Sequence, residues 1–586
     1  PGDWPDRLMG DVPNIYLYAA NNPSEASLAK RRSNAVVVTH MTPPLREAGL
    51  YRELQDLKQS LEVWRGLDDG HAKKSDLEML IAEQATQLDL SNVAIDDLWG
   101  KLLELEGSLI PEGLHVLGQV LEGEQLDNLV AQMPQDTQEG ARKNLAEDHE
   151  LPGLMRALDG RYIAPVPGGD IIHRPDILPT GRNIHAFDPF RLPTAYAVHH
   201  GRQQAELLLE THKEFPRSIA MVLWGSDNIK SDGTAMSQAL ALMGACPRFD
   251  SFGRLCGADL IPLEELGRPR IDVIMTLSGI FRDLLPLQSR MLAEAALKAV
   301  MAEDEPLSMN FVRAHALDVA KETGCSLEDA ALRVFSNAEG AYGSNVNQLV
   351  DSSSFDDEDE LADAYEARKS FAYGVRGKAM AKPEMLQKAL AKVDLAYQNL
   401  ESVELGVTSV DHYFDTLGGV ARAVRRARDG KAAPVYICDQ SHGDAKVRSL
   451  KEQVALETRS RSLNPVFYEA LLKHGHEGVR SIEAHITNTM GLSATTGDVE
   501  PWVYKKLSET FILDPDMRKR LTALNPQASM RMTNRLLEAS ERSYWTPEPG
   551  MLEALQQAAD EVEDEVEGLN EGQSFAPQQT MRKEMA

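Results

Sequence analysis

The sequence predicts a multidomain α/β protein, with a doubly wound parallel α/β region, largely helical insertions and a helical C-terminal region. Strand-like apolar runs alternate with helical patterns over residues 14–60 and again over 218–279, and this alternation is typical of a parallel sheet. Apolar residues at three-to-four spacing indicate helices over 51–150 and after residue 281. At 586 residues, the chain is also too long for a single hydrophobic core.

These patterns divide the chain into five expected parts. Residues 1–50 begin the α/β core, and 51–150 form a helical insertion. Residues 151–350 continue the α/β core and carry a Gly/Pro-rich loop, 351–570 are mostly helical, and 571–586 form a disordered tail. Because the chain opens with Pro1 rather than Met, we expect a fragment of a longer chain or a processed one.

The first elements are two short strands separated by a helix. NIYLYAA (Asn14–Ala20) has the pattern of a buried strand, and a helix is expected to begin near Ser24. VVVTH (Val36–His40) is the second strand, and Pro43 with Pro44 ends this unit. Residues 160–200 are too rich in Pro and Gly for a regular helix or a central strand.

The α/β pattern returns with a strand at Ser218–Ser226, a helix across Ala235–Met243 and a strand at Ile271–Gly279. Ligands of such folds gather at the carboxyl ends of the strands. Helices are expected to dominate from residue 281 on. The acidic run Asp356–Glu360 is expected to enter a helix, and Pro434–Asp439 to form a further, isolated strand.

Composition excludes several classes of function. The net charge of −29 argues against nucleic-acid binding, which requires clustered Lys and Arg. The four cysteines are scattered without a CxxC pair, which argues against a zinc ribbon, an iron–sulfur site or a disulfide framework. No apolar run approaches the roughly 20 residues of a membrane span, and no signal segment is visible. These features are typical of a protein of the reducing cytoplasm.

Common catalytic motifs are missing as well. The chain has no GxxxxGK[ST] loop, so we expect no nucleotide site and no ATP hydrolysis in it. It also lacks GxGxxG after a strand, HExxH and GxSxG. Polar residues in the loops of an α/β frame instead suit a site that positions a ligand and supplies acid–base groups.

The first candidate segment is NNPSEASLAKRRSN (Asn21–Asn34), which offers Asn22, Glu25 and Arg31. Glu25 falls in the first turn of the expected helix, where the helix dipole favours a carboxylate. It is either a simple capping residue or a carboxylate that faces a cleft at a strand's carboxyl end. The basic run that contains Arg31 either pairs with propionates or forms a solvated face.

The second candidate segment is the loop Gly168–Pro189. A loop of this length is uncommon unless it is functional. Its alternative is a surface crossover whose Asp and Asn residues only cap turns. The candidate binding residues in it are His173, Arg182, Asn183, His185 and Asp188.

Two further segments complete the candidates. Arg333–Asn347 offers Asn337 and Asn345, and its alternative is a polar connecting loop. In VDHYFD, His412 and Asp415 are three positions apart, so a helix would place them on one face. A lone His–Asp pair is more often structural than catalytic.

Together these segments resemble the magnesium chelatase H-subunit family, over the C-terminal half of its members. The matching strings occur in one order along almost the whole chain. They include IYLYAANNPSEASLAKRRSNAV, DILPTGRNIHAFDP, VLWGSDNIKSDG, EELGRPRIDVIMTLSGIFRDL, RVFSNAEGAYGSNVN, DHYFD and LNPVFYEALLKHGHEGVRSIE. The short Met- and acid-rich linker sequences resemble the branch of the family that makes bacteriochlorophyll.

The resemblance implies a catalytic subunit that inserts Mg²⁺ into protoporphyrin IX for (bacterio)chlorophyll synthesis. It implies that Glu25, His412 and Asp415 lie at the porphyrin cavity, and Glu25 is the candidate transient ligand of Mg²⁺. Implied partners are an AAA+ ATPase subunit and a subunit with an integrin-like domain. The implied location is the cytoplasm, or the plastid stroma in a plant or alga, with peripheral membrane contact as an option.

Three alternatives stay open at this point. The large subunit of cobaltochelatase, from cobalamin synthesis, shares parts of the pattern. A non-catalytic tetrapyrrole carrier or sensor would bind the ring and hand it on. A structural helical scaffold would require the Gly/Pro-rich loop to be inert.

Overall fold

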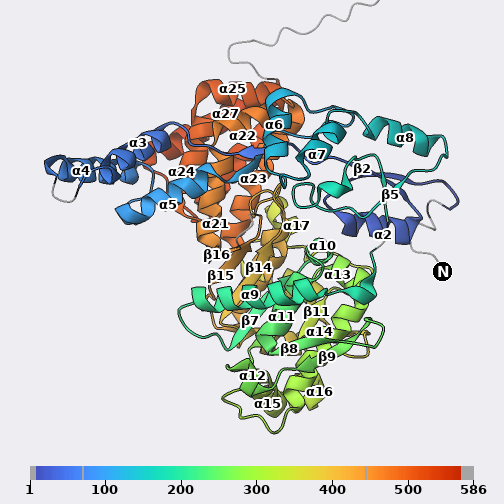
Figure 1. Cartoon of the computed structure of the whole chain (residues 1–586). Helices are drawn as coiled ribbons and strands as arrows, with labels where there is room; N and C mark the ends of the chain where they lie inside the picture. Colours follow the sequence, from blue (N-terminus) through green and yellow to red (C-terminus); the bar gives the residue numbers. More distant parts are fainter. Residues whose placement is uncertain (1–7, 9, 69–70, 186, 442–444, 569–586) are drawn as a thin grey trace, which may run out of the picture.

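The computed structural model describes residues 8, 10–68, 71–185, 187–441 and 445–568. The expected disordered tail at 571–586 therefore lies outside the described residues. At the centre of the fold is an eight-stranded sheet in the order β13-β12-β11-β10-β7-β14-β15-β16 (Figure 1). Its strands are β7 (Ser218–Leu223), β10 (Asp272–Leu277), β11 (Val334–Ser336), β12 (Phe371–Tyr373), β13 (Ala379–Ala381), β14 (Leu395–Leu400), β15 (Val435–Asp439) and β16 (Lys446–Ser449).

The five middle strands of this sheet are parallel, and the strands at both edges are antiparallel. After β7 the chain adds β10 and β11 on one side, and then returns to add β14 and β15 on the other. The direction of winding therefore reverses at β7. Such a reversal is the topological switch point at which open α/β sheets bind ligands.

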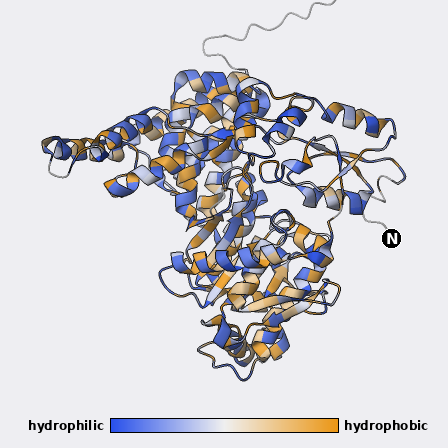
Figure 2. Cartoon of the chain, in the orientation of Figure 1, coloured by the Kyte–Doolittle hydropathy of each residue, from blue (hydrophilic) through white to orange (hydrophobic). Residues whose placement is uncertain are grey.

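Helices cover both faces of the sheet, which confirms the doubly wound prediction. Ile219 and Met221 of β7 enter one hydrophobic core, whereas Ala220 and Val222 enter another. Figure 2 shows apolar residues concentrated along these strands. The first core includes α11 (Thr234–Met243) and α14 (Pro286–Met301), with α9 (Ala195–Thr211) packed on α11. The second includes α15 (Phe311–Thr323), α18 (Asp359–Lys369), α19 (Pro383–Leu390) and α20 (Gly419–Ala427).

The expectation of helices after residue 281 is only partly correct. Strands β11 to β16 all come from that region, and β15, expected to be isolated, pairs with both β14 and β16. These strands are short, and β14 reads LAYQNL, in which buried Gln and Asn break the apolar pattern. Their place in the sheet comes from tertiary pairing rather than from an apolar run.

A small unit precedes the sheet and packs against it. Parallel strands β1 (Ile15–Ala19) and β2 (Val36–His40) flank α2 (Pro23–Ser33), close to the predicted bounds, but they form a sheet of their own. Helix α2 packs against α10 (Gly225–Lys230) and α13 (Gly279–Leu284), which begin at the ends of β7 and β10. The unit therefore covers the carboxyl ends of the central strands.

The Gly/Pro-rich loop and neighbouring short elements complete this unit. Among the described residues of 160–194, the regular elements are β5 (Pro165–Val166), β6 (Asn183–Ile184) and two 3-10 turns (Pro175–Ile177 and Pro189–Arg191). Helix α9 begins at Ala195, so the expectation of no regular helix over 160–200 is wrong for the last residues of that range. Around the loop lie β3 (Leu45–Glu47) paired with β4 (Leu109–Pro111), α6 (Gly123–Ala131), α7 (Gln138–Leu145) and α8 (Glu150–Leu158).

The remaining elements are mostly helical, as expected. An arm with its own leucine-rich core projects to the left in Figure 1 and consists of α3 (Glu53–Arg65), α4 (Ala72–Gln87) and α5 (Ile95–Glu106). The C-terminal bundle consists of α21 (Leu450–Glu457), α22 (Pro465–Leu472), α23 (His476–Thr495), α24 (Pro501–Ser508), α25 (Pro515–Leu524), α26 (Pro526–Glu541) and α27 (Pro549–Glu567). Over the described ranges, no helix has the length and apolar character needed to span a bilayer.

The other short elements lie between the main ones. They are the hairpin β8 (Ala245–Phe249) and β9 (Leu255–Leu260), together with α12 (Leu263–Leu266), α16 (Leu327–Ala330) and α17 (Val346–Asp351). Three π-helical turns occur at Tyr413–Gly418, Thr458–Ser462 and Glu509–Leu513.

Candidate active site

A cavity of about 1060 Å³ lies where the β1-α2-β2 unit meets the central sheet. Most of its wall comes from three stretches of chain: Asn14–Pro43, the segments that follow β7 and β10, and Gln398–Thr416 at the end of β14 and beyond it. Leu114, His115, Tyr342, Gly343 and Lys369 also line it. The cavity therefore opens at the carboxyl ends of the strands around the topological switch point. Its size is at the upper end of the roughly 300–1,000 Å³ typical of ligand pockets.

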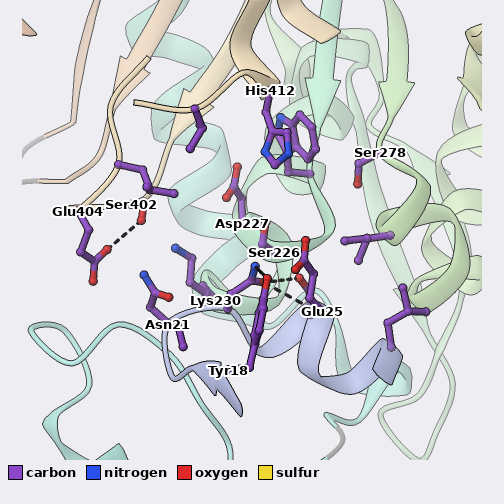
Figure 3. Close-up of a pocket in the computed structure, with 18 of the residues that line it drawn as sticks. Tyr18, Asn21, Glu25, Ser226, Asp227, Lys230, Ser278, Ser402, Glu404 and His412 are labelled. Carbon is purple, nitrogen blue, oxygen red and sulfur yellow. Dashed lines mark hydrogen bonds between the residues drawn. The ribbon is translucent and has the colours of Figure 1, made fainter. Parts of the chain in front are cut away.

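Glu25 lies in the first turn of α2, on the cavity side (Figure 3). The side chain of Asn22 caps this helix and accepts a hydrogen bond from the Glu25 backbone N–H at 3.5 Å. Burial raises the pKa of the Glu25 carboxyl, and the nearby His412 partly opposes that rise. Asn22 also lines the cavity, and its amide donates to the Tyr18 hydroxyl at 3.2 Å.

Asp227 and Glu401 bring two more carboxyl groups to the cavity. Asp227 lies in α10 just after β7, and Glu401 is the first residue after β14. Burial raises the pKa of Asp227, while Lys230 and His412 oppose the rise. Burial, followed by the charge of Asp227, raises the pKa of Glu401, and Lys230 opposes this rise. Two acids and one lysine therefore interact in one wall of the cavity.

His412 and Asp415 both line the cavity but make different contacts. The ring of His412 stacks on Trp224, with centroids 4.9 Å apart, and its Nε2 lies 3.7 Å from a carboxylate oxygen of Asp411. Asp415 is buried in a π-helical turn, where its carboxylate accepts hydrogen bonds from the backbone of the 344–347 segment. His412 can thus face a ligand, whereas Asp415 holds the neighbouring loop in place.

Other ionisable groups surround the cavity. His40 and His115 both line it, and their rings stack with centroids 5.7 Å apart. Nε2 of His115 lies 2.7 Å from the buried carboxylate of Glu150. Lys369 is almost fully buried, and its ammonium donates to the side-chain oxygen of Asn337 at 2.8 Å. Burial lowers the pKa of Lys369 to about 8.

The other residues of the sequence prediction do not line the cavity. In the 333–347 segment, Asn337 is buried and donates to the Gly343 carbonyl at 2.6 Å. Asn345 adopts a left-handed backbone conformation (φ 65°) at the start of α17. On α2, Arg31 is directed away and donates to the Asp283 carbonyl at 2.7 Å.

The five loop candidates lie outside the cavity lining, and two of them, Arg182 and Asn183, contact the small unit. The side-chain oxygen of Asn183 accepts hydrogen bonds from Lys30 at 2.5 Å and from the Val37 backbone at 3.2 Å. Arg182 donates to the Pro165 carbonyl at 2.6 Å. Nδ1 of His173 lies 3.6 Å from a carboxylate oxygen of Asp170. Asp188 caps a 3-10 turn, and His185 is exposed.

Segment 14–40 and only part of segment 160–280 therefore meet at this cavity. Residues that follow β7 and β10 line the cavity, whereas the Gly/Pro-rich loop instead supports the β1-α2-β2 unit. The dense polar content of the loop comes from turn caps and from hydrogen bonds to that unit.

Trp224, Asp227, Lys230 and Glu401 were not among the sequence candidates, although they line the cavity. Each follows a buried strand of the central sheet directly or within a few residues. The rule that ligands gather at carboxyl ends of strands points to Trp224 and Asp227, since β7 is visible in the sequence. Glu401 could not be found in this way because β14 has no clear strand pattern.

The ionisable side chains that line the cavity suit proton transfer and transient contact with a cation rather than permanent binding of a metal ion. Among the described residues, no three His, Cys, Asp or Glu side chains come together as a metal-binding group. Each of the carboxylates that line the cavity can hold a proton or contact a cation briefly.

The fold and the cavity define an α/β protein with a large cavity lined by several acid–base groups. More specifically, the chain belongs to the CobN/magnesium chelatase family, whose model matches residues 1–149 and 135–552. This result confirms the family resemblance seen in the sequence.

Individual relatives are consistent with that family. The chain is 66% identical over 569 residues to the magnesium-chelatase H subunit of Cereibacter sphaeroides, and the match covers 97% of this chain and 48% of that protein. It is 36% identical over 698 residues to the chloroplastic magnesium-chelatase protein ChlH of Oryza sativa subsp. indica, covering 97% and 50%.

Among solved structures, the catalytic subunit of cobaltochelatase from Mycobacterium tuberculosis matches with a TM-score of 0.87 and 29% identity. The match covers 95% of this chain and 55% of that one. The chain thus spans about half the length of the relatives that it matches.

Proposed function

We propose that this chain is the porphyrin-binding catalytic part of a magnesium chelatase, which inserts Mg²⁺ into protoporphyrin IX. One observation carries the proposal: the cavity at the switch point combines ring-sized space with half-buried carboxylates and a stacked Trp224–His412 pair. The 66% identity to a magnesium-chelatase H subunit supports magnesium as the metal.

In this proposal, the apolar and aromatic walls hold the macrocycle, and the carboxylates take up protons. Insertion removes two pyrrole N–H protons, while the nitrogen lone pairs become ligands of the cation. Mg²⁺ is the substrate ion, and it prefers oxygen ligands, so Glu25 is the proposed transient ligand and proton acceptor. His412, with its ring on Trp224, is placed to contact the ring or to accept a proton.

Asp415 acts less directly in this proposal. By accepting hydrogen bonds from the Ser344 and Asn347 backbone, it fixes the loop beside Lys369 and Tyr342 at the cavity. The remaining sequence candidates would act, if at all, by supporting α2 and the loops around the cavity. They are Arg31, His173, Arg182, Asn183, His185, Asp188, Asn337 and Asn345.

Dehydrating Mg²⁺ is costly, and the chain has no phosphate-binding glycine loop. We therefore propose that ATP is hydrolysed by separate subunits, an AAA+ ATPase and a subunit with an integrin-like domain. The net charge of −29 offers a surface for a basic partner. The proposed location is the cytoplasm, or the plastid stroma in a plant or alga.

The test combines the full-length protein with ATP, Mg²⁺, deuteroporphyrin and the two partner subunits. Formation of the magnesium porphyrin, measured by its fluorescence, is the expected result. Binding of the porphyrin without metallation would instead indicate a carrier or sensor. Faster insertion of Co²⁺ than of Mg²⁺, each supplied alone, would indicate a cobaltochelatase, the activity named for the 29% identical structural relative.

A further inference from the structure

Asp227 is a second carboxylate placed to react with a ligand in the cavity. It follows β7, lines the cavity, and lies between Glu25 and His412 in Figure 3. Within the described part of the chain, no residue donates a hydrogen bond to its carboxylate. Buried and half-buried carboxylates normally have such partners, so an unsatisfied one at a cavity wall marks a site where something else binds.

Glu401 also lines the cavity and interacts electrostatically with Asp227. Its Oε1 is buried and, among the described residues, has no hydrogen-bond partner. The charges of Asp227 and Lys230 both act on Glu401. Because one lysine cannot balance two nearby carboxylates in a buried setting, one of the two acids retains a proton. Asp227 and Glu401 together thus keep one ionised carboxylate at the cavity wall.

The charged surroundings of Asp227 come from several elements. Lys230 lies on α10, Glu25 on α2, and Glu401 follows β14, while His412 precedes a π-helical turn. The hydroxyl of Tyr413 also interacts with both acids of the pair. Asp227 therefore lies among two carboxyl groups, one ammonium, one imidazole and one phenol.

The stoichiometry of insertion requires more than one acceptor. Each porphyrin loses two pyrrole protons, and Glu25 alone can take up only one of them before it must be recharged. We propose that Asp227 is the second proton acceptor of this site, with Glu401 as the residue that positions and tunes it. This inference rests on the proposed function and assigns a role within it.

The proposed step is balanced. A pyrrole N–H bond breaks, its electron pair stays on nitrogen as a donor to Mg²⁺, and the proton forms an O–H bond on Asp227. Glu25 accepts the other proton in the same way. Two protons leave the ring for one divalent cation, so the metallated ring carries the same charge as the free one.

The direct test is Asp227→Asn in the full-length protein, assayed with its partner subunits and deuteroporphyrin. We expect kcat to fall by about 10²- to 10⁴-fold, the range of a lost general base. The Kd for deuteroporphyrin, measured by fluorescence quenching, should change by less than about threefold, because Asn keeps the shape of the wall. Asp227→Glu restores a carboxylate and should recover part of kcat.

Asp232→Asn is the matched control. Asp232 is exposed and lies outside the cavity lining, with a left-handed backbone (φ 53°) that Asn also adopts readily. The Asp232→Asn variant should keep the wild-type kcat. An Asp227→Asn protein with wild-type kcat, or one in which porphyrin binding is lost in proportion to rate, would overturn the inference.

Glu401→Gln tests the positioning role through the pH profile. In the wild type, Glu401 loses its proton as pH rises, and the new charge should strengthen Asp227 as a base and increase kcat. Gln mimics the protonated form, so the variant should keep most of its neutral-pH rate but lose this alkaline rise. A profile that superposes on that of the wild type would overturn the role of Glu401.

Different results would contradict the proposed function and the proposed role of Asp227. If the wild-type complex makes no metallated porphyrin, the proposed function is wrong. If it does, and Asp227→Asn matches it while remaining folded, only the second acceptor is wrong.

Discussion

At the scale of single residues, Glu25 lies both in the first turn of α2, next to the capping residue Asn22, and in the cavity wall. Glu25→Gln keeps the size and the hydrogen bonding of the side chain but removes the charge. Within the complete chelatase, we expect the insertion rate to fall by orders of magnitude. The porphyrin affinity should shift by less than about tenfold, roughly 1.4 kcal/mol, because apolar contacts hold most of the ring. Insertion assays and fluorescence titration measure the two effects separately.

The raised pKa of Glu25 predicts the direction in which kcat changes with pH. Burial raises the pKa of Glu25, so the wild-type carboxyl takes up a proton on acidification at a higher pH than an exposed Glu, and kcat should fall there. Because the fold disfavours the ionised form, replacing it with Gln should leave the melting temperature unchanged or raise it. A rate loss that follows a loss of thermal stability would indicate a capping role only.

Which site residues could be predicted depended on local signals. Glu25 and His412 stand in compact polar motifs, so the sequence singled out both, and both line the cavity. Asp227 and Glu401 are single acids after strands, and only the packing of α2 over the sheet brings them together. His173 and His185 gave a strong compositional signal, yet they lie outside the cavity lining.

At the scale of elements, the cavity depends on close packing between α23 and the π-helical turn Tyr413–Gly418. A Cβ on Gly491 of α23 would lie 2.6 Å from the ring of Phe414, which is fully buried. Gly491→Ala should therefore displace the turn that follows His412 and carries Asp415. Such overpacking typically costs about 1–3 kcal/mol, and the variant should melt at a lower temperature and bind deuteroporphyrin more weakly.

Gly550→Ala provides the comparison for this variant. Gly550 lies in the first turn of α27, and a Cβ there would meet no atom within 4 Å. Since Ala favours the helix more than Gly does, the Gly550→Ala variant should be as stable as the wild type or more stable. Equal melting temperatures and porphyrin affinities for the two variants would show that the turn tolerates displacement.

Elements were predicted where the local pattern was unambiguous. Strands β2, β7 and β10 are apolar, β-branched runs, and the sequence placed all three. The three-residue strands β11, β12 and β13 are shorter than a reliable pattern, and they exist because neighbouring strands supply hydrogen-bond partners. Local sequence could not show those partners.

At the scale of the whole molecule, the chain is large and acidic, and its sequence has no phosphate-binding glycine loop. We predict that the purified chain hydrolyses no ATP. Phosphate release should remain at the background rate with Mg²⁺ present, and rise only when the AAA+ partner is added. Magnesium-dependent turnover that co-purifies with the chain alone, and persists after further chromatography, would contradict this prediction.

The walls of the cavity are also synthesised at different times during translation. Glu25 lies near the start of the described chain, whereas the last residue that lines the cavity is Thr416. At about 5–20 residues per second, a ribosome needs roughly 20 to 80 seconds to synthesise the intervening stretch. During that interval, α2 has emerged without the strand ends against which it packs. A nascent chain therefore cannot capture a ring early in translation, and a product truncated before residue 401 would lack one whole wall of the cavity.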